Sequence, residues 1–553
     1  MIHQRELRRT RTRRIALASA LAFAAVGLVP FTTSAASAAD DTGCHERQNN
    51  SAAKLIDCVK TADLWKHMVN FQKIADANPG PDGHPSRNAG EPGYKASVDY
   101  VAKAMKAAGY KVTIQTYTFD YFTFVGTPAF SVVSPTPTTF VAGKDFNPGQ
   151  VNAPTATAAV QTVGHTVIPP TPTPPPSSAS GCDPADFAGF VPGHIALIQR
   201  GTCTFGTKAT NAQAAGASGV IIFNEGNPGR TALLNGSLVL ADGSPASLHI
   251  PVVFTPFATG QDLYTQATTG TAPVVTIDVK TFEDPNRADY NVIAESKSGD
   301  PNSVLVVDAH LDAIFGAGML DNASGSAAIL DIAQQLAHTK TPNKLRFIWF
   351  GGEELGLLGS NHYVSSLSPT ELSKIKFDLD ADVLATPNYV AGVLDPKGVA
   401  LFSRGPGTPM PPAINAPSRV ARDAGIAYLN SIHQNNIQFS ADGTDAFVFE
   451  QAGIPASGVL TGQDCCKLQS DVDLFGGQTG NFEGNLGTTD GGCVDNPFRW
   501  CDNLSNNDPT VLTFMSKTFA AMVAKMSFDT TVLHPVIHGP SKGRHEARGH
   551  PDK

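Results

Sequence analysis

The 553-residue chain is predicted to form a three-layer α/β/α fold around a central mixed, mainly parallel sheet, plus a small β-rich inserted domain. Strand and helix patterns alternate from about residue 285 to 530, whereas residues 135–280 are rich in Thr, Val, Pro and Gly. The length suits two or three domains, and 41% hydrophobic with 16% charged residues is a globular composition.

The alternating pattern justifies each element of the larger domain. Apolar residues recur at helical spacing in some segments, and others are short apolar or alternating runs typical of strands. The predicted elements are helices over 96–108, over 324–336 and from Leu355, and strands over 110–117, 303–307, 345–350 and 375–382. Repeated strand–helix units favour a mainly parallel sheet with helices on both faces.

Changes of composition set the predicted domain boundaries. The larger domain is interrupted by an insert that contains short β runs such as 252–254 and 274–277. The predicted parts are a leader over 1–38, the two halves of the larger domain over 39–134 and 281–530, the insert over 135–280, and a disordered tail over 531–553.

The N-terminus has the pattern of a cleaved signal peptide. Six arginines precede an apolar run from Ile15 to Val29, and Ala36–Ala38 forms a small-residue cleavage site. A membrane anchor is the alternative, but the apolar run is short and ends at Pro30. We therefore expect a secreted, extracellular protein. Removal of residues 1–38 changes the net charge from -9 to -14, which disfavours nucleic acids and anionic membranes as partners.

Eight cysteines in an exported chain are expected to form disulfides. Cys44 is expected to pair with Cys58, and Cys182 with Cys203. Spacing alone leaves three pairings open for the remaining four, which are Cys465, Cys466, Cys493 and Cys501. A structural zinc site is the alternative for these four, but no C-x-x-C spacing supports it.

Polar residues collect where the predicted buried strands end. His310 and Asp312 directly follow the strand over 303–307, and ligands in open α/β sheets gather at the carboxyl ends of strands. Asp312 is expected to orient the His310 imidazole. Asp321 closes a glycine-rich loop before the helix over 324–336, and taken alone it is equally well explained as a helix cap.

Two further segments supply carboxylates at strand ends. Glu353 and Glu354 close the strand over 345–350, and Asp382 lies at the end of a strand with Asp at alternate positions. Taken singly, these are also explained as an acidic first helical turn and a solvated edge strand. Together with His310 and Asp321 they predict an oxygen- and nitrogen-rich metal site of the kind that zinc prefers, with one carboxylate left free as a base.

These motifs resemble the co-catalytic di-zinc aminopeptidase family, which contains secreted bacterial leucine-type aminopeptidases. The likeness covers most of residues 62–525. It rests on HLD (310–312), GxGxxDNxSG (316–325), GGEELGLLGS (351–360), TPN (386–388) after the Asp-rich strand, and residues 440–462.

The resemblance implies a role for each residue of the site. His310 and Asp382 would bind one zinc ion, Asp321 would bridge to a second, and Glu354 would bind that second ion. Glu353 would be the catalytic proton acceptor. Two metals about 3.5–4 Å apart polarise a scissile carbonyl and lower the pKa of the attacking water. Peptide or protein substrates are therefore expected.

The insert resembles a protease-associated domain, through residues 181–187, 198–205 and 214–223. Such inserts are usually non-catalytic lids or recognition surfaces, and a plain structural insert is the equally weighted alternative.

The chain departs from the family pattern near its end. The family closes its site with Cys-Tyr-His-x-x-Cys-Asp, and alignment on Cys501 and Asp502 places Pro497 at the Tyr and Phe498 at the His. The usual fifth ligand is therefore missing from its place. A carboxylate could replace it, a distant histidine could fold in, or the second zinc site could be weak or empty. The candidate replacements are Asp490, Asp495, His433 and His84.

The leading functional hypothesis is a zinc aminopeptidase that removes the N-terminal residue of peptides. One alternative is a non-catalytic binding protein with a degraded metal site, although such a protein would not need to keep Glu353. Another is a carboxypeptidase or deacylase on the same fold, because fold alone does not fix the reaction.

Overall fold

The structure is a computed structural model that describes residues 42–171, 178–401, 403–463, 467–480, 482 and 500–533. The predicted leader over 1–38 and all but three residues of the predicted tail lie outside this range. No helix in the described part of the chain has both the length and the apolar character that crossing a bilayer requires.

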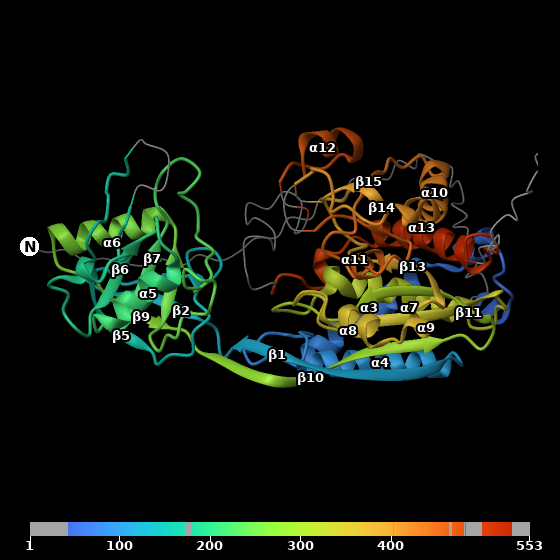
Figure 1. Cartoon of the computed structure of the whole chain (residues 1–553), viewed down its shortest axis with the longest axis horizontal. Helices are drawn as coiled ribbons and strands as arrows, with labels where there is room; N and C mark the ends of the chain where they lie inside the picture. Colours follow the sequence, from blue (N-terminus) through green and yellow to red (C-terminus); the bar gives the residue numbers. More distant parts are fainter. Residues whose placement is uncertain are drawn as a thin grey trace, which may run out of the picture. The chain divides into compact units, whose positions relative to one another are not determined.

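The larger domain is built on an eight-stranded mixed sheet, as predicted (Figure 1). Its order is β1-β10-β12-β11-β13-β16-β14-β15, with the four central strands β12, β11, β13 and β16 parallel. The strands are β1 (Lys111–Phe124), β10 (Thr281–Glu295), β11 (Asp300–His310), β12 (Asn343–Phe350), β13 (Ile375–Ala381), β14 (Gly392–Val399), β15 (Ile437–Phe439) and β16 (Ala456–Leu460).

Both faces of this sheet are covered by helices, because the central strands are apolar on both sides. On one face, Leu305 and Val307 of β11 lie in a core with the first group of helices; on the other, Val304 and Val306 pack with the second group. The first group is α2 (Ala52–Cys58), α3 (Thr61–Ala77), α4 (Pro92–Ala107), α7 (Ser324–Leu336), α10 (Asn415–Ser431) and α13 (Pro509–Ser527). The second is α8 (Leu358–Ser366), α9 (Pro369–Leu372) and α11 (Ala446–Gln451).

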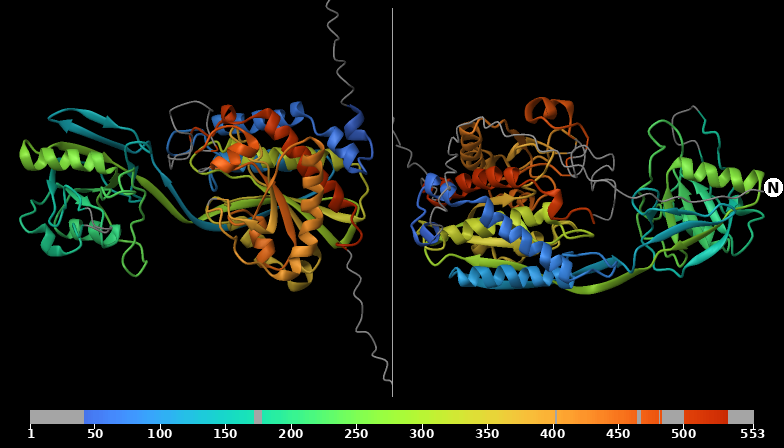
Figure 2. Two further views of the ribbon diagram at one scale, coloured as in Figure 1. Left: turned by 90° about the horizontal axis from the view of Figure 1, so that it is seen from above. Right: turned by 180° about the vertical axis from the view of Figure 1, so that it is seen from behind.

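Helices from the beginning and from the end of the described chain pack together in the first group. Helix α13 packs against α2 and α3, and in Figure 2 its red ribbon lies beside the blue N-terminal helices. Asp508 caps α13 by accepting hydrogen bonds from the N–H groups of Thr510 and Val511. Pro509 occupies the first turn, where it costs no hydrogen bond.

The insert has its own eight-stranded sheet, in the order β3-β2-β9-β5-β6-β7-β8-β4. Strands β5, β6, β7 and β8 are parallel, and the pairings at both ends are antiparallel. The strands are β2 (Ala129–Ser134), β3 (Thr138–Phe140), β4 (Asn147–Pro148), β5 (Ala156–Thr162), β6 (Ile195–Gln199), β7 (Gly219–Phe223), β8 (Val252–Thr255) and β9 (Val274–Asp278).

Two separate hydrophobic cores hold the insert together. Along β6 and β7, successive side chains face opposite sides of the sheet. One set packs in a core with α6 (Phe257–Thr269), and the other set packs in a second core with α5 (Phe205–Ala214). The predicted Cys182–Cys203 disulfide is present and links the segment before β6 to the loop between β6 and α5. The predicted Cys44–Cys58 disulfide is also present, and Cys501 is disulfide-bonded as well. Cys465, Cys466 and Cys493 lie outside the described residues.

Helix α8 begins at Leu358 rather than at the predicted Leu355. Gly352, Gly356 and Leu357 all have positive φ, so the chain turns before the helix starts. This turn carries Glu353 and Glu354.

Candidate metal centre

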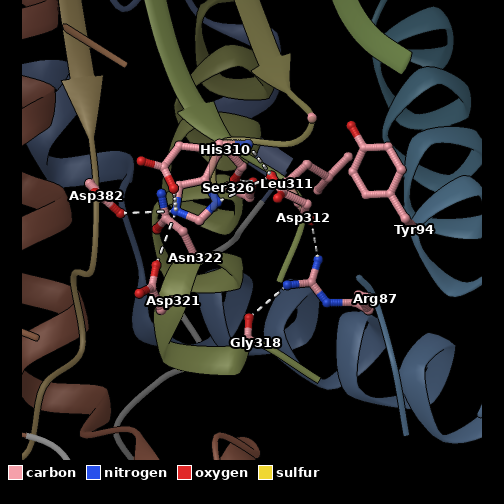
Figure 3. A network of polar contacts seen from close by, with 12 residues as sticks. Arg87, Tyr94, His310, Leu311, Asp312, Gly318, Asp321, Asn322, Ser326 and Asp382 are labelled. Atoms are coloured by element: carbon pink, nitrogen blue, oxygen red, sulfur yellow. Dashed lines mark hydrogen bonds and ion pairs between the residues drawn. The ribbon is translucent and has the colours of Figure 1, made fainter. Parts of the chain in front are cut away.

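Three buried side chains converge at the carboxyl ends of the parallel strands (Figure 3). His310 ends β11, and Asp382 directly follows β13 on the neighbouring strand. The His310 Nε2 atom lies 3.0 Å from Asp321 Oδ1 and 3.3 Å from Asp382 Oδ1. One ligand atom of each residue lies within 4.8 Å of the other two, so these residues could hold one metal ion.

Glu353 and Asp312 lie beside this group. The Glu353 Oε2 atom is 3.8 Å from His310 Nε2, and both residues are buried. Asp312 Oδ1 accepts a hydrogen bond of 3.2 Å from the Glu353 backbone N–H and lies 3.5 Å from His310 Nδ1. Asp312 therefore contacts both the imidazole and the turn that carries Glu353.

The loop before α7 is fixed to the end of β13 through Asn322. Its amide nitrogen donates to the Ala381 carbonyl at 2.8 Å, and its amide oxygen accepts from the N–H groups of Gly325 and Val383. A side chain on Gly325 would come within 2.0 Å of the Ala381 carbonyl oxygen, so only glycine allows this approach. The Asp321–Asn322 peptide bond is cis.

Asp502 holds the same loop from another side. Its carboxylate accepts hydrogen bonds from the N–H groups of Leu320 at 2.7 Å and Asp321 at 3.1 Å. Burial raises the pKa of Asp502 to about 6, against the opposing effect of these two backbone donors.

A second network supports the turn that carries Glu353. The Tyr117 hydroxyl donates to the Gly351 carbonyl at 2.6 Å and lies 2.9 Å from Asp289 Oδ2. A side chain on Gly351 would meet the Tyr94 hydroxyl at 2.3 Å. The backbone just before Glu353 is thus packed tightly between buried polar groups.

The electrostatics of the centre call for positive charge. Burial lowers the pKa of His310, but the negative charge of Glu353 and the contacts with Asp312, Asp321 and Asp382 outweigh it, so the pKa is raised well above its usual value. A proton on His310 compensates the surrounding carboxylates, and a bound metal ion would take over that role.

Glu353 and Asp445 are carboxyl groups with strongly shifted titration. Burial is the largest effect on Glu353 and raises its pKa. The attraction of His310 acts in the opposite direction but is smaller, so the pKa stays well above its usual value. Burial also raises the pKa of Asp445, which lies at the start of α11, to about 7. Such shifts are common at functional sites.

The structure brings together some of the predicted site residues and leaves others apart. His310, Asp321 and Asp382 form the three-ligand group, with Glu353 and Asp312 in contact. Glu354 is half-buried in the same turn but is not part of that group.

Of the candidates for a fifth ligand, the two that the structure describes, His84 and His433, are not in the group either. The His84 ring stacks on Trp500 with 3.8 Å between ring centroids, and His433 is exposed just after α10. Asp490, Asp495, Pro497 and Phe498 lie outside the described residues.

Sequence reasoning missed Asp445, Asp502 and Arg87, all of which are buried at or near the centre. Asp445 lies within residues 440–462, which carried the resemblance, and Asp502 lies in the closing segment that was aligned with the family's Cys-Asp pair, so these positions were the available signal. Nothing in the sequence around Arg87 indicated its role.

The donor atoms fit a zinc ion. Zinc is typically bound by imidazole nitrogen and carboxylate oxygen, and three protein ligands leave a position open for water or substrate. Asp382 Oδ1 is buried without a hydrogen bond and faces His310 Nε2 at 3.3 Å, as expected for two atoms that share one cation.

Comparison with known proteins agrees with this geometry. Residues 291–523 match the model of peptidase family M28, and residues 164–263 match that of the PA domain. Two structures of aminopeptidases, from Aneurinibacillus sp. strain AM-1 and the zinc aminopeptidase BSAP of Bacillus subtilis, share the fold. Each superposes with a TM-score of 0.54, at 22% and 21% identity, covering 86% and 85% of this chain and 96% of each neighbour.

Sequence relatives extend the match over most of the chain. An aminopeptidase of Pseudomonas aeruginosa is 36% identical over 492 residues, which cover 87% of this chain and 83% of that protein. A probable leucine aminopeptidase 2 of Trichophyton verrucosum is 31% identical over 435 residues, covering 76% and 77%. The resemblance noted in the motifs is confirmed, and the chain belongs to peptidase family M28 and carries a PA domain.

Proposed function

We propose that the protein is a secreted zinc aminopeptidase that hydrolyses the N-terminal residue of peptides. The observation that carries this proposal is the convergence of His310, Asp321 and Asp382 beside the carboxylate of Glu353. Membership of the M28 family and the names of the relatives support aminopeptidase activity.

In this proposal the chain holds zinc through His310, Asp321 and Asp382. The ion would polarise the scissile carbonyl and lower the pKa of a water molecule. Glu353 takes the proton from that water and passes it to the leaving amine. Burial raises the pKa of Glu353, which makes its carboxylate a stronger proton acceptor than an exposed one.

Asp312 positions both His310 and Glu353. It faces the Nδ1 side of His310, which keeps Nε2 directed at the metal position, and it holds the backbone of Glu353. The resemblance also implies a second zinc ion bound by Asp321 and Glu354. Elemental analysis of the purified protein decides whether this chain binds one zinc ion or two.

Export is supported by the leader pattern over 1–38 and by the Cys44–Cys58 and Cys182–Cys203 disulfides, since disulfides persist in oxidising compartments. The insert is proposed as a non-catalytic surface that affects access to substrate.

The test uses residues 39–553, purified and subjected to elemental analysis. Aminoacyl-anilides are assayed with and without a chelator, and N-acetylated versions serve as the matched control. We expect bound zinc, chelator-sensitive release from the free amines and none from the blocked substrates. Bound zinc with cleavage of the blocked substrates would instead indicate a deacylase or endopeptidase. A protein with neither zinc nor turnover would be a binding protein, and the proposal would fail.

A further inference from the structure

Arg87 is a fully buried arginine whose side chain bonds to backbone carbonyls (Figure 3). Its Nε atom donates to the Ala317 carbonyl at 2.7 Å, Nη1 to the Leu311 carbonyl at 2.7 Å, and Nη2 to the Gly318 carbonyl at 2.6 Å. The planar guanidinium thus satisfies three acceptors at fixed relative positions, which a point-like ammonium cannot do.

The three carbonyls belong to the two segments that carry metal ligands. Leu311 directly follows His310, and Ala317 and Gly318 lead into Asp321. The backbone repeats this connection: the Ala313 N–H donates to the Arg87 carbonyl at 3.2 Å, and the Arg87 N–H donates to the Gly316 carbonyl at 3.0 Å. One residue therefore links both sides of the centre.

Asn88 adds a further bond to the same loop. Its side-chain oxygen accepts a hydrogen bond of 3.0 Å from the Gly316 N–H. On the other side, Asp502 accepts from the N–H groups of Leu320 and Asp321. The loop is thus held through its carbonyls by Arg87 and through its amides by Asp502.

A buried charge is expensive, so its retention calls for an explanation. Burial lowers the pKa of Arg87 to about 10, against the attraction of Asp502 and Asp312, and the side chain stays protonated at neutral pH. The guanidinium carbon lies 5.1 Å from the centre of the Phe71 ring. An apolar residue could fill this space, but it would leave three buried carbonyls without donors.

We propose that Arg87 is a positioning residue that fixes the separation of His310 and Asp321 and so preorganises the metal centre. This inference rests on the proposed function. A simpler reading is that Arg87 only supplies positive charge near a carboxylate-rich site, and the two readings predict different results for lysine at this position.

The experiment compares Arg87→Lys with Arg346→Lys. Arg346 also lies in the larger domain, on β12, and bonds Glu295 and the Tyr363 hydroxyl away from the centre. Zinc affinity is measured by chelator competition on folded protein, alongside kcat and KM. For Arg87→Lys we expect zinc affinity to fall about 10- to 100-fold, and kcat at saturating zinc to fall with KM little changed. Arg346→Lys should have the zinc affinity and the kcat of the wild type.

A lysine variant with wild-type zinc affinity and kcat would overturn the inference, because lysine keeps the charge and loses the three-way geometry. If Arg87→Lys does not fold, Asn88→Ala takes its place, since Asn88 is only half-buried and holds the same loop through one bond. There we expect a smaller loss of zinc affinity, about 3- to 10-fold, and no loss would contradict the proposal. A wild type that binds no zinc would defeat the proposed function itself.

Discussion

The parallel strands of the peptidase sheet and those of the PA insert are built alike but end differently. In both sheets, central parallel strands are buried on both faces and flanked by helices. The peptidase strands end in His310, the turn with Glu353, and Asp382. The insert strands β6 and β8 end at Gln199 and Thr255, with no metal-binding group among the described residues there.

Two polar side chains at the insert strand ends, Gln199 and Asn224, serve the backbone, whereas the Thr255 hydroxyl is buried without a hydrogen-bond partner. Gln199 donates to the carbonyls of Val167 and Glu225 and accepts from the Val167 N–H, and Asn224 donates to the Ala232 carbonyl. In the peptidase sheet, by contrast, Asp382 Oδ1 makes no hydrogen bond to the backbone and faces the His310 imidazole, with Nε2 at 3.3 Å. The same topology thus supports either local structure or chemistry, and the cluster of imidazole and carboxylate groups at the peptidase strand ends distinguishes them.

The largest expected effect comes from replacing a ligand. His310→Ala should abolish zinc binding and lower kcat/KM by about 10³-fold or more, because the polarising ion is worth several kcal/mol. The insert offers a control in the exposed His249, and His249→Ala should leave zinc content and kcat/KM unchanged. Full activity in His310→Ala would remove the contrast between the two sheets.

Glu353→Gln should separate metal binding from proton transfer. The amide cannot accept the proton, so kcat should fall about 10²- to 10⁴-fold while elemental analysis finds unchanged zinc. Glu371→Gln is the control, because Glu371 is exposed and its carboxylate pairs with Lys374 at the surface. Normal turnover by Glu353→Gln would show that another group is the base.

Glu450 in α11 should make the stability of the peptidase domain depend on pH. Burial, with the charges of Asp395 and Asp442, raises its pKa from 4.5 to about 8. The folded state keeps this proton after the unfolded chain has lost it, so the free energy of unfolding should decrease as pH rises from about 4.5 to 8 and then level off.

Glu450→Gln removes this dependence. Urea unfolding at pH 5 and pH 8 should show a gain on the order of a few kcal/mol at pH 8 relative to the wild type, with little difference at pH 5. If the free energy of unfolding changed with pH equally in the wild type and in Glu450→Gln, Glu450 would not be the cause of the pH dependence.

The smallest effect on function is expected at the insert strand ends. Gln199→Leu removes hydrogen bonds from buried backbone groups, which should cost about 1–3 kcal/mol of stability. The kcat on a small anilide should stay within about twofold, because Gln199 serves structure only. A large fall in kcat with the fold intact would assign chemistry to the insert and break the comparison.

Much of the architecture could be predicted because it depends on local pattern. The helix over 324–336 and the strand over 345–350 follow apolar periodicity, and two disulfides follow cysteine spacing. The strand predicted over 303–307 is part of β11, which extends further, to His310. The convergence of His310, Asp321 and Asp382 followed from the rule that ligands gather at strand ends.

The rest depends on contacts between distant parts of the chain. Arg87 reaches carbonyls more than 220 positions away, and Asp502 reaches amides about 180 positions away, so neither has a local signature. Val383, just after Asp382, has φ of 52°, which a β-branched residue adopts only when its surroundings impose it. The predictions for Phe498 and for the late cysteines 465, 466 and 493 lie outside the described residues and stay predictions.

The most direct test of the central claim is an anomalous difference map from a crystal of the zinc-loaded protein, recorded on both sides of the zinc absorption edge. We predict a zinc peak bounded by His310 Nε2, Asp321 and Asp382, with the Glu353 carboxylate nearby and unbound. A zinc-loaded protein with no peak at this position, or with zinc only at other residues, would contradict the account.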